Sequence, residues 1–275
     1  MTKESKNVFS IANKYIVLAT PLILFSLFSN IYVVFSASGR IVNFLITLIL
    51  LVLMSGAFLA GWFLMVKKAV NDEYPDNPYL LMKDFIPGVG EYFLSVTGGV
   101  FCTTAFALLI LVLAFVFGNN LIGDIGITSE QLTKAMESTE ALKIFLSTLT
   151  IEQMVKIKQW NILILISLFM IHFLLIFYYP AMFYKKNNPF ISLFIGIKDL
   201  FTERFFEVLT IVFLFAIVYL FLSAFSALTA KFALLHLLAT MLNFYFIIIF
   251  VVWSFNFYSR NIVHSYLGKN IDKTI

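Results

Sequence analysis

The chain has 275 residues, of which 61% are hydrophobic and only 12% charged, and it carries a net charge of +4. A soluble domain has about 25% charged and about 45–50% apolar residues, so this composition excludes a single soluble core and requires lipid to solvate part of the surface. The basic excess is explained by Lys and Arg beside membrane segments, and no basic patch interleaved with aromatics indicates nucleic-acid binding.

Six apolar runs, each of about 20 residues or more, are long enough to cross roughly 30 Å of hydrocarbon. They cover about 15–37, 41–66, 92–117, 160–184, 208–230 and 232–258. The first run is longer than the ~7–15-residue apolar core of a signal peptide, so it predicts a retained helix, bent near Pro21. In the second run Gly56 with Ala60, and Ala57 with Gly61, have a spacing that lets helices approach closely in lipid. The fold class expected is an all-α polytopic membrane bundle with additional interfacial helices.

The longest polar segment, 118–159, separates the third and fourth runs. Thr128 with Gln131, and Thr150 with Gln153, have the spacing of capping boxes. We expect about two short extracytoplasmic helices here, the last leading into the fourth span. They would dock on the membrane or cover the mouth of the bundle.

A second polar segment, 184–207, lies between the fourth and fifth runs. Its small and polar residues recur every three or four positions, which places them on one stripe of a helix: Ser192, Gly196, Asp199, Glu203 and Glu207. The acidic members Asp199, Glu203 and Glu207 indicate either a stripe facing water or a docking surface. That surface would meet a partner protein or the lysines of the connection at 67–91, which we expect to lie flat on the membrane.

The distribution of basic residues predicts the orientation. With the N-terminus in the cytoplasm, 13 of the 19 Lys and Arg residues fall in cytoplasmic segments and 6 in outer ones. The positive-inside rule therefore favours a cytoplasmic-membrane protein with both termini inside.

None of the acidic or basic residues falls within a predicted span, although in-membrane charges are the usual mark of coupled transporters. His172 is the deepest titratable side chain. It predicts either a neutral histidine hydrogen-bonded to nearby backbone or a proton-relay or ligand role.

Cys102 is interpreted as a packing residue, and the histidines have no partner at metal-binding spacing. We find no catalytic motif and expect no cofactor.

The two cytoplasmic connections correspond to each other. Lys67-Lys68, Asn77-Pro78 and Lys83-Asp84 in the first match Lys185-Lys186, Asn188-Pro189 and Lys198-Asp199 in the second. This pattern indicates a duplicated helical hairpin.

Gly61-Trp62 before Lys67-Lys68, the segment 78–88 with Lys83-Asp84-Phe85, and the segment 189–206 carry a resemblance to a family. The chain resembles bacterial six-helix membrane proteins of unknown function, similar to the membrane domain fused to glycerophosphodiester phosphodiesterases. The resemblance implies a six-helix fold and supplies no catalytic residues, since the phosphodiesterase domain is absent.

The leading hypothesis is a non-enzymatic multi-pass protein that organises lipid or a partner protein in the cell envelope. The alternative is a transporter or permease subunit that uses 189–206 as a cytoplasmic coupling helix. A membrane enzyme is the least favoured of the three. The expected partners are the lipid bilayer and a protein at the cytoplasmic face, with no nucleic acid.

Overall fold

The structure is a computed structural model that describes residues 7–36, 41–185, 187–202 and 204–263. All regular structure within these ranges is helical, which confirms the all-α part of the expected fold class. The described residues include five helices long and apolar enough to cross a membrane, or six if one bent pair counts as a single span. The chain divides into two compact units. Unit 1 comprises Met1–Thr103 with Phe173–Ile275, and unit 2 comprises Thr104–His172.

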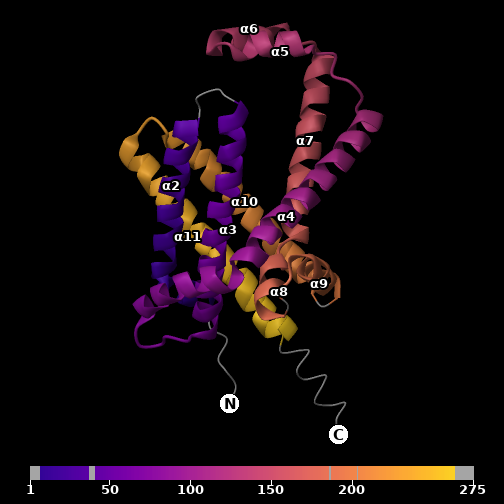
Figure 1. The fold of residues 1–275 in the computed structure, drawn as a ribbon. Coiled ribbons are helices and arrows are strands. Elements are labelled where there is room, and N and C mark those ends of the chain that lie inside the picture. The colour runs from indigo at the N-terminus through magenta and orange to yellow at the C-terminus, as the bar shows by residue number, and fades with distance from the viewer. Residues whose placement is uncertain (1–6, 37–40, 186, 203, 264–275) are drawn as a thin grey trace. The chain divides into compact units, whose positions relative to one another are not determined.

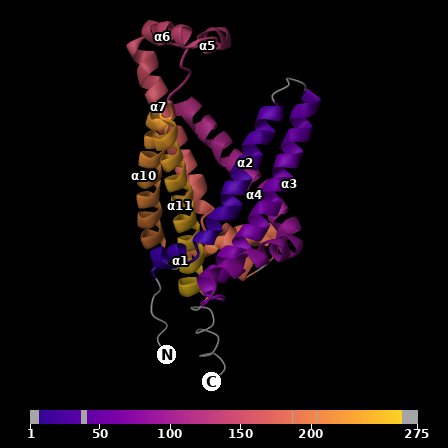
Figure 2. The same ribbon diagram turned by 90° about the vertical axis from the view of Figure 1, so that its left-hand side faces the viewer.

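Unit 1 is a bundle of long helices with short elements across one end, here called the basal end (Figures 1 and 2). Helices α2, α3, α10 and α11 run alongside one another, with α2 packed on α3 and α10 on α11. Its elements are α1 (Val8–Lys14), η1 (Ile16–Leu18), α2 (Ala19–Ser36), α3 (Ile41–Asn71), η2 (Pro78–Asp84), the first half of α4 (Phe85–Leu121), α8 (Tyr178–Tyr184), α9 (Pro189–Thr202), α10 (Phe205–Thr229), α11 (Ala233–Phe257) and η3 (Tyr258–Val263).

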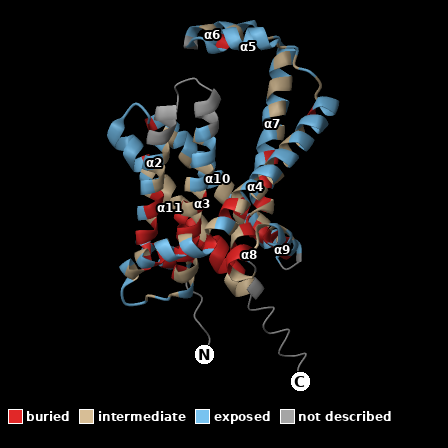
Figure 3. Ribbon diagram, in the orientation of Figure 1, coloured by how far each residue is buried: buried red, intermediate tan, exposed pale blue. Residues whose placement is uncertain are grey.

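Buried side chains of unit 1 gather at the basal end, whereas the far ends of its helices are largely exposed (Figure 3). Aromatic rings form much of this core. Phe58 stacks on Trp62, and Phe63 packs against Phe255 at 5.5 Å. The indole of Trp62 donates a hydrogen bond to the carbonyl of Leu18 at 2.9 Å. Exposed apolar side chains on long helices are what a bundle solvated by lipid requires.

The first span bends earlier than predicted. Val8–Lys14 and Ile16–Asn30 meet at 73°, so the break lies at Tyr15 and not near Pro21. Pro21 falls in the first turn of α2. A proline is tolerated there because its missing N–H would have no helical acceptor.

Glycines bring α3 and α4 into close contact, as the small-residue spacing predicted. A Cβ added at Gly61 would lie 2.7 Å from Phe85. One added at Gly88 would lie 2.9 Å from the Cα of Gly61 and 3.0 Å from the carbonyl oxygen of Ala60. Both positions therefore require glycine for steric reasons.

Unit 2 contains the second half of α4, α5 (Ser129–Met136), α6 (Thr139–Thr148) and most of α7 (Ile151–Leu174). Both predicted capping boxes form. Thr128 and Gln131 exchange hydrogen bonds of 3.3 and 3.0 Å, and Thr150 and Gln153 exchange bonds of 3.2 and 3.0 Å. The two short helices are thus confirmed, and α7 begins directly after its cap at Thr150.

Candidate functional site

Helix α9 begins at a strong sequence signal. The Asn188 side chain accepts a hydrogen bond from the backbone N–H of Ile191 at 3.1 Å, and Pro189 occupies the first helical position. Both features are typical of a helix N-terminus.

The burial of α9 is the reverse of that expected for a helix in water. Its small and polar stripe faces the bundle, where Ser192, Gly196 and Asp199 are buried. Its phenylalanines face outward, and Phe194 is 74% exposed, with Phe190 and Phe201 also exposed. The helix therefore presents an aromatic surface, here called the α9 aromatic face.

Asp199 is the centre of a buried polar cluster, here called the Asp199 cluster. Its side chain is 2% exposed and accepts from the Lys185 ammonium at 2.8 Å. The Tyr258 hydroxyl donates to the same carboxylate oxygen at 2.6 Å. The water-facing stripe is therefore wrong at Asp199, because its charge is neutralised inside unit 1 by a lysine of the same connection. Asp199 is not displayed to a separate partner.

The other two acidic residues of the stripe are placed differently. Glu207 lies in the first turn of α10 and pairs with Arg204 at 3.1 Å. Both side chains are about half exposed, and such surface pairs are worth about 0–1 kcal/mol. Glu203 lies outside the described residues. A docking role for Glu207 and Glu203 stays a prediction.

A helix break explains why α9 packs so closely at this point. The predicted fourth span is interrupted between Leu174 and Tyr178. Pro180 has no N–H to bond the carbonyl of Ile176, four residues earlier. The hydroxyl of Ser254 on α11 replaces it, donating to that carbonyl at 2.7 Å. A hydroxyl of this kind is how membrane bundles satisfy a freed carbonyl.

Gly196 of α9 rests on the same break. A Cβ added at Gly196 would lie 3.0 Å from the carbonyl carbon of Phe177 and 3.1 Å from its oxygen. The break, the glycine and the Asp199 cluster together fix α9 against α8 with its polar stripe inward.

The Asp199 cluster has two counterparts in unit 1. In the Asp84 cluster, Lys68 donates to the Asp84 carboxylate at 2.7 Å, and the ring of Tyr74 lies 5.8 Å from the ammonium. A hydrogen bond with Asp84 raises the pKa of Tyr74. Both ion pairs join the Lys-Lys to the Lys-Asp dipeptide of a predicted hairpin, but Lys68 is the second lysine of its dipeptide and Lys185 the first. The duplication of the hairpins stays a prediction.

The third is the Asp72 cluster. Lys14 and Tyr15 both donate to one Asp72 oxygen at 2.7 Å. Each of the three clusters therefore joins a carboxylate to a lysine and places that lysine over a tyrosine ring, at 5.5 to 5.8 Å. A cation over an aromatic face adds attraction of about 0.5–1 kcal/mol at exposed sites. The clusters fasten the short elements of the basal end to the long helices.

His172 is exposed on α7. A carbonyl can only accept, so its Nδ1–H donates to the backbone oxygen of Leu168 in its own helix, at 2.8 Å. This contact matches the hydrogen-bonded interpretation, and a relay role stays an untested alternative.

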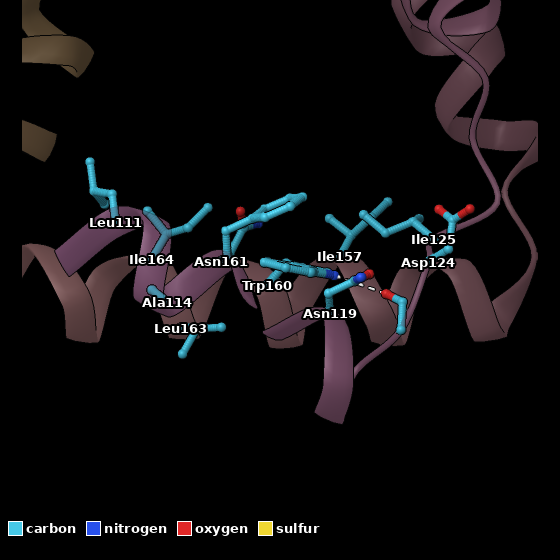
Figure 4. Close-up of a pocket in the computed structure, with 12 residues that line it drawn as sticks. Leu111, Ala114, Asn119, Asp124, Ile125, Ile157, Trp160, Asn161, Leu163 and Ile164 are labelled. Carbon is cyan, nitrogen blue, oxygen red and sulfur yellow. Dashed lines mark hydrogen bonds between the residues drawn. The ribbon is translucent and has the colours of Figure 1, made fainter. Parts of the chain in front are cut away.

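Unit 2 contains an open groove of about 560 Å³ between α4, the following loop and α7. Figure 4 shows Leu111 and Ile164 at one end and Asp124 and Ile125 at the other, with Trp160 between them. The Trp160 indole donates to the carbonyl of the loop residue Gly123 at 3.3 Å. The volume falls within the range of about 300–1,000 Å³ that is usual for small-molecule sites.

Within the described ranges, no group of three His, Cys, Asp or Glu side chains is placed to hold a metal ion. The carboxylates of the three clusters are each engaged by an ammonium. The α9 aromatic face and the unit 2 groove are two surfaces that are open to a ligand.

Several residues of these sites were not singled out as site residues from the sequence. Tyr258 and Ser254 act on segments far away in the sequence, so spacing gave no signal for them. The carboxylates Asp84 and Asp199 did have a signal, since they lie at matched positions in the predicted repeat, and each hairpin has a Lys-Lys dipeptide before them. For the groove residues Asn119 and Asn161, the only signal in the sequence was a polar side chain at the end of an apolar run.

The predicted resemblance to bacterial six-helix membrane proteins stays untested by sequence or structural relatives. Comparison of the chain with protein-family models, curated proteins and solved structures finds no match.

Proposed function

We propose that the chain is a non-enzymatic, multi-pass protein of the cytoplasmic membrane that organises lipid at the inner leaflet. The single observation that carries this proposal is the α9 aromatic face. A helix that buries its carboxylate and exposes its phenylalanines is matched to an apolar environment and not to cytosol.

The energetic gain from placing this face in lipid is substantial. Full burial of a phenylalanine contributes about 1.5–3 kcal/mol. Phe190, Phe194 and Phe201 are exposed by 68, 74 and 58%, so their insertion into the acyl boundary would contribute about 3–6 kcal/mol. Lys198 is exposed on the same helix, and its ammonium suits anionic headgroups.

The proposed topology has six spans, with the basal end and both termini in the cytoplasm. Lys14, Lys67, Lys68 and Lys185 all belong to the basal end, which agrees with the positive-inside rule. The bent pair of α1 and α2 supplies the first span. Reporter fusions at Lys134 and Lys198 should report opposite sides of the membrane, and a shared side would refute this topology.

Spin-label accessibility tests the position of α9. In a Cys102→Ser background, a nitroxide at Phe194→Cys in vesicles should collide with oxygen and be protected from a water-soluble nickel chelate. The reference is Glu130→Cys on α5, where the side chain is 78% exposed and the chelate should dominate. Chelate access at 194 equal to that at 130 would contradict insertion.

Lipid analysis tests the function itself. After mild-detergent purification, mass spectrometry should find anionic phospholipid retained by the wild type and reduced in a variant with Phe190, Phe194 and Phe201 changed to Ser. The permease alternative makes a different prediction. If the same variant loses a stoichiometric ATPase and retains its lipid, α9 is a coupling helix and the lipid proposal fails.

A further inference from the structure

The unit 2 groove changes from apolar to polar along its length (Figure 4). Its apolar end is formed by Leu111, Ala114 and Ile164, and Asn119 and Asp124 lie toward its polar end. A helix rises about 1.5 Å per residue, so the eight positions from Leu111 to Asn119 cover about 12 Å. A ligand that fits must itself be amphiphilic and elongated.

Two amide groups face the groove without a protein partner, that of Asn119 toward the polar end and that of Asn161 between Trp160 and Ile164 (Figure 4). Asn119 and Asn161 line the groove, and no hydrogen bond joins either side chain to another part of the chain that the structure describes. Each amide has two donor hydrogens and one acceptor oxygen. Both side chains are exposed, so their donor hydrogens are accessible to a bound molecule with acceptor oxygens.

Trp160 indicates the depth of the groove in a bilayer. Its ring packs on Gly118 and against Phe115, at 5.7 Å between ring centres. Tryptophan is enriched at the membrane–water boundary. The polar end therefore lies at headgroup level, while Ile164, one turn further along α7, lies about 6 Å deeper.

Side chains of α7 hold the polar end in place. Lys156 donates to the main-chain carbonyl of Asp124 at 3.0 Å, and Gln153 donates to that of Gly126 at 3.3 Å. Lys156 also pairs with Glu152 at 3.0 Å. The groove is thus formed before any ligand enters, which reduces the entropy lost on binding.

We propose that this groove binds one phospholipid of the outer leaflet with a zwitterionic, ammonium-bearing headgroup. One acyl chain lies along the apolar end, and ester or phosphate oxygens accept hydrogen bonds from Asn119 and Asn161. The Asp124 carboxylate favours an ammonium over a second anion, and Lys156 with Glu152 leaves the local charge at about −1. The outer-leaflet position rests on the proposed topology. Unit 2 contains no part of α9, so the groove and the α9 aromatic face can fail separately.

The test uses the full chain in zwitterionic phospholipid vesicles that contain phosphatidylethanolamine with a photoreactive acyl chain. After illumination, peptide mapping should place the label at Leu111, Ala114 and Ile164 in at least fivefold excess over Val112. Val112 is 57% exposed and does not line the groove, so it reports ordinary boundary lipid.

Two pairs of variants separate the groove from the surrounding lipid. Ala114→Trp fills the groove and should lower the labelling of Ile164 at least fivefold, whereas Val112→Trp should leave it unchanged. Asn119→Ala with Asn161→Ala removes both amides without obstructing the groove and should lower the labelling of Ile164 at least twofold, with Asn120→Ala as the neighbouring control. The second pair keeps the test valid if Ala114→Trp does not fold.

Equal labelling of Ala114 and Val112, or labelling that resists both groove variants, would overturn the site. A phosphatidylglycerol probe that labels as well as phosphatidylethanolamine would overturn the headgroup assignment. Labelling that favours phosphatidylethanolamine and falls with both variants supports the proposal as stated.

Discussion

The three Lys–Asp–Tyr clusters provide a graded test of how burial sets the strength of an ion pair. The Asp side chains are 2, 10 and 20% exposed at Asp199, Asp84 and Asp72. Changing each to Asn removes the charge and keeps the shape. Asn also tolerates the left-handed backbone at Asp72, where φ is +55°, so backbone strain does not enter the comparison.

The magnitudes follow from that exposure. Removing one partner of a buried pair costs about 3–5 kcal/mol, because an ammonium is left without its counter-ion. Asp199→Asn should approach this range, since Lys185 is itself only 21% exposed. An exposed pair is worth about 0.2–1 kcal/mol, and Asp72→Asn should lie nearest to this range because Lys14 and Asp72 are the most exposed of the three pairs, at 32 and 20%. Asp84→Asn should fall between them.

The assay is heating of the purified protein in mild detergent, followed by size-exclusion chromatography to find the temperature at which half the monodisperse peak is lost. The midpoint should fall most for Asp199→Asn and least for Asp72→Asn. Replacing the whole Asp199 cluster by Lys185→Met, Asp199→Leu and Tyr258→Phe should recover most of the loss, because no buried charge remains. A reversed order of midpoints, or a triple variant weaker than the single one, would refute the reasoning.

Three further predictions concern single positions. Gly88→Val forces a side chain onto the backbone of α3 and should cost about 1–3 kcal/mol, whereas Gly90→Ala meets nothing within 4 Å and should keep the wild-type midpoint. Ser254→Ala leaves the carbonyl at the helix break unsatisfied and should cost about 1–3 kcal/mol, and Thr240→Ala, which loses only an intrahelical bond, should not. Thr128→Ala should cost about 0.5–2 kcal/mol locally, seen as faster amide exchange confined to α5.

Local signals in the sequence predicted local structure well. The capping boxes at Thr128 and Thr150 each name both of their partners within four residues, and both form. The glycines of α3 let another helix approach closely whichever helix that is, so their role in helix packing was also predictable. Hydropathy alone was sufficient to predict long apolar helices.

Long-range packing decided what the sequence could not. No proline marks the bend at Tyr15 in the sequence. The bend is stabilised by hydrogen bonds from Lys14 and Tyr15 to Asp72, which lies more than 50 positions away. Pro21 predicted a bend near position 21. Because Pro21 lies in the first turn of α2, its missing N–H does not interrupt the helical hydrogen bonds. The break before Pro180 is stabilised by Ser254 of another helix, a pairing that no sequence spacing shows.

The orientation of α9 shows why an amphipathic pattern is ambiguous in a membrane protein. In water the apolar stripe must turn inward, so Asp199 on the opposite stripe would be predicted to face solvent. Beside lipid the outer surface is itself apolar, and polar side chains are more stable where they find partners inside. The pattern fixes two faces but not which one is outside. That choice depends on whether a counter-ion lies within the bundle, as Lys185 does for Asp199.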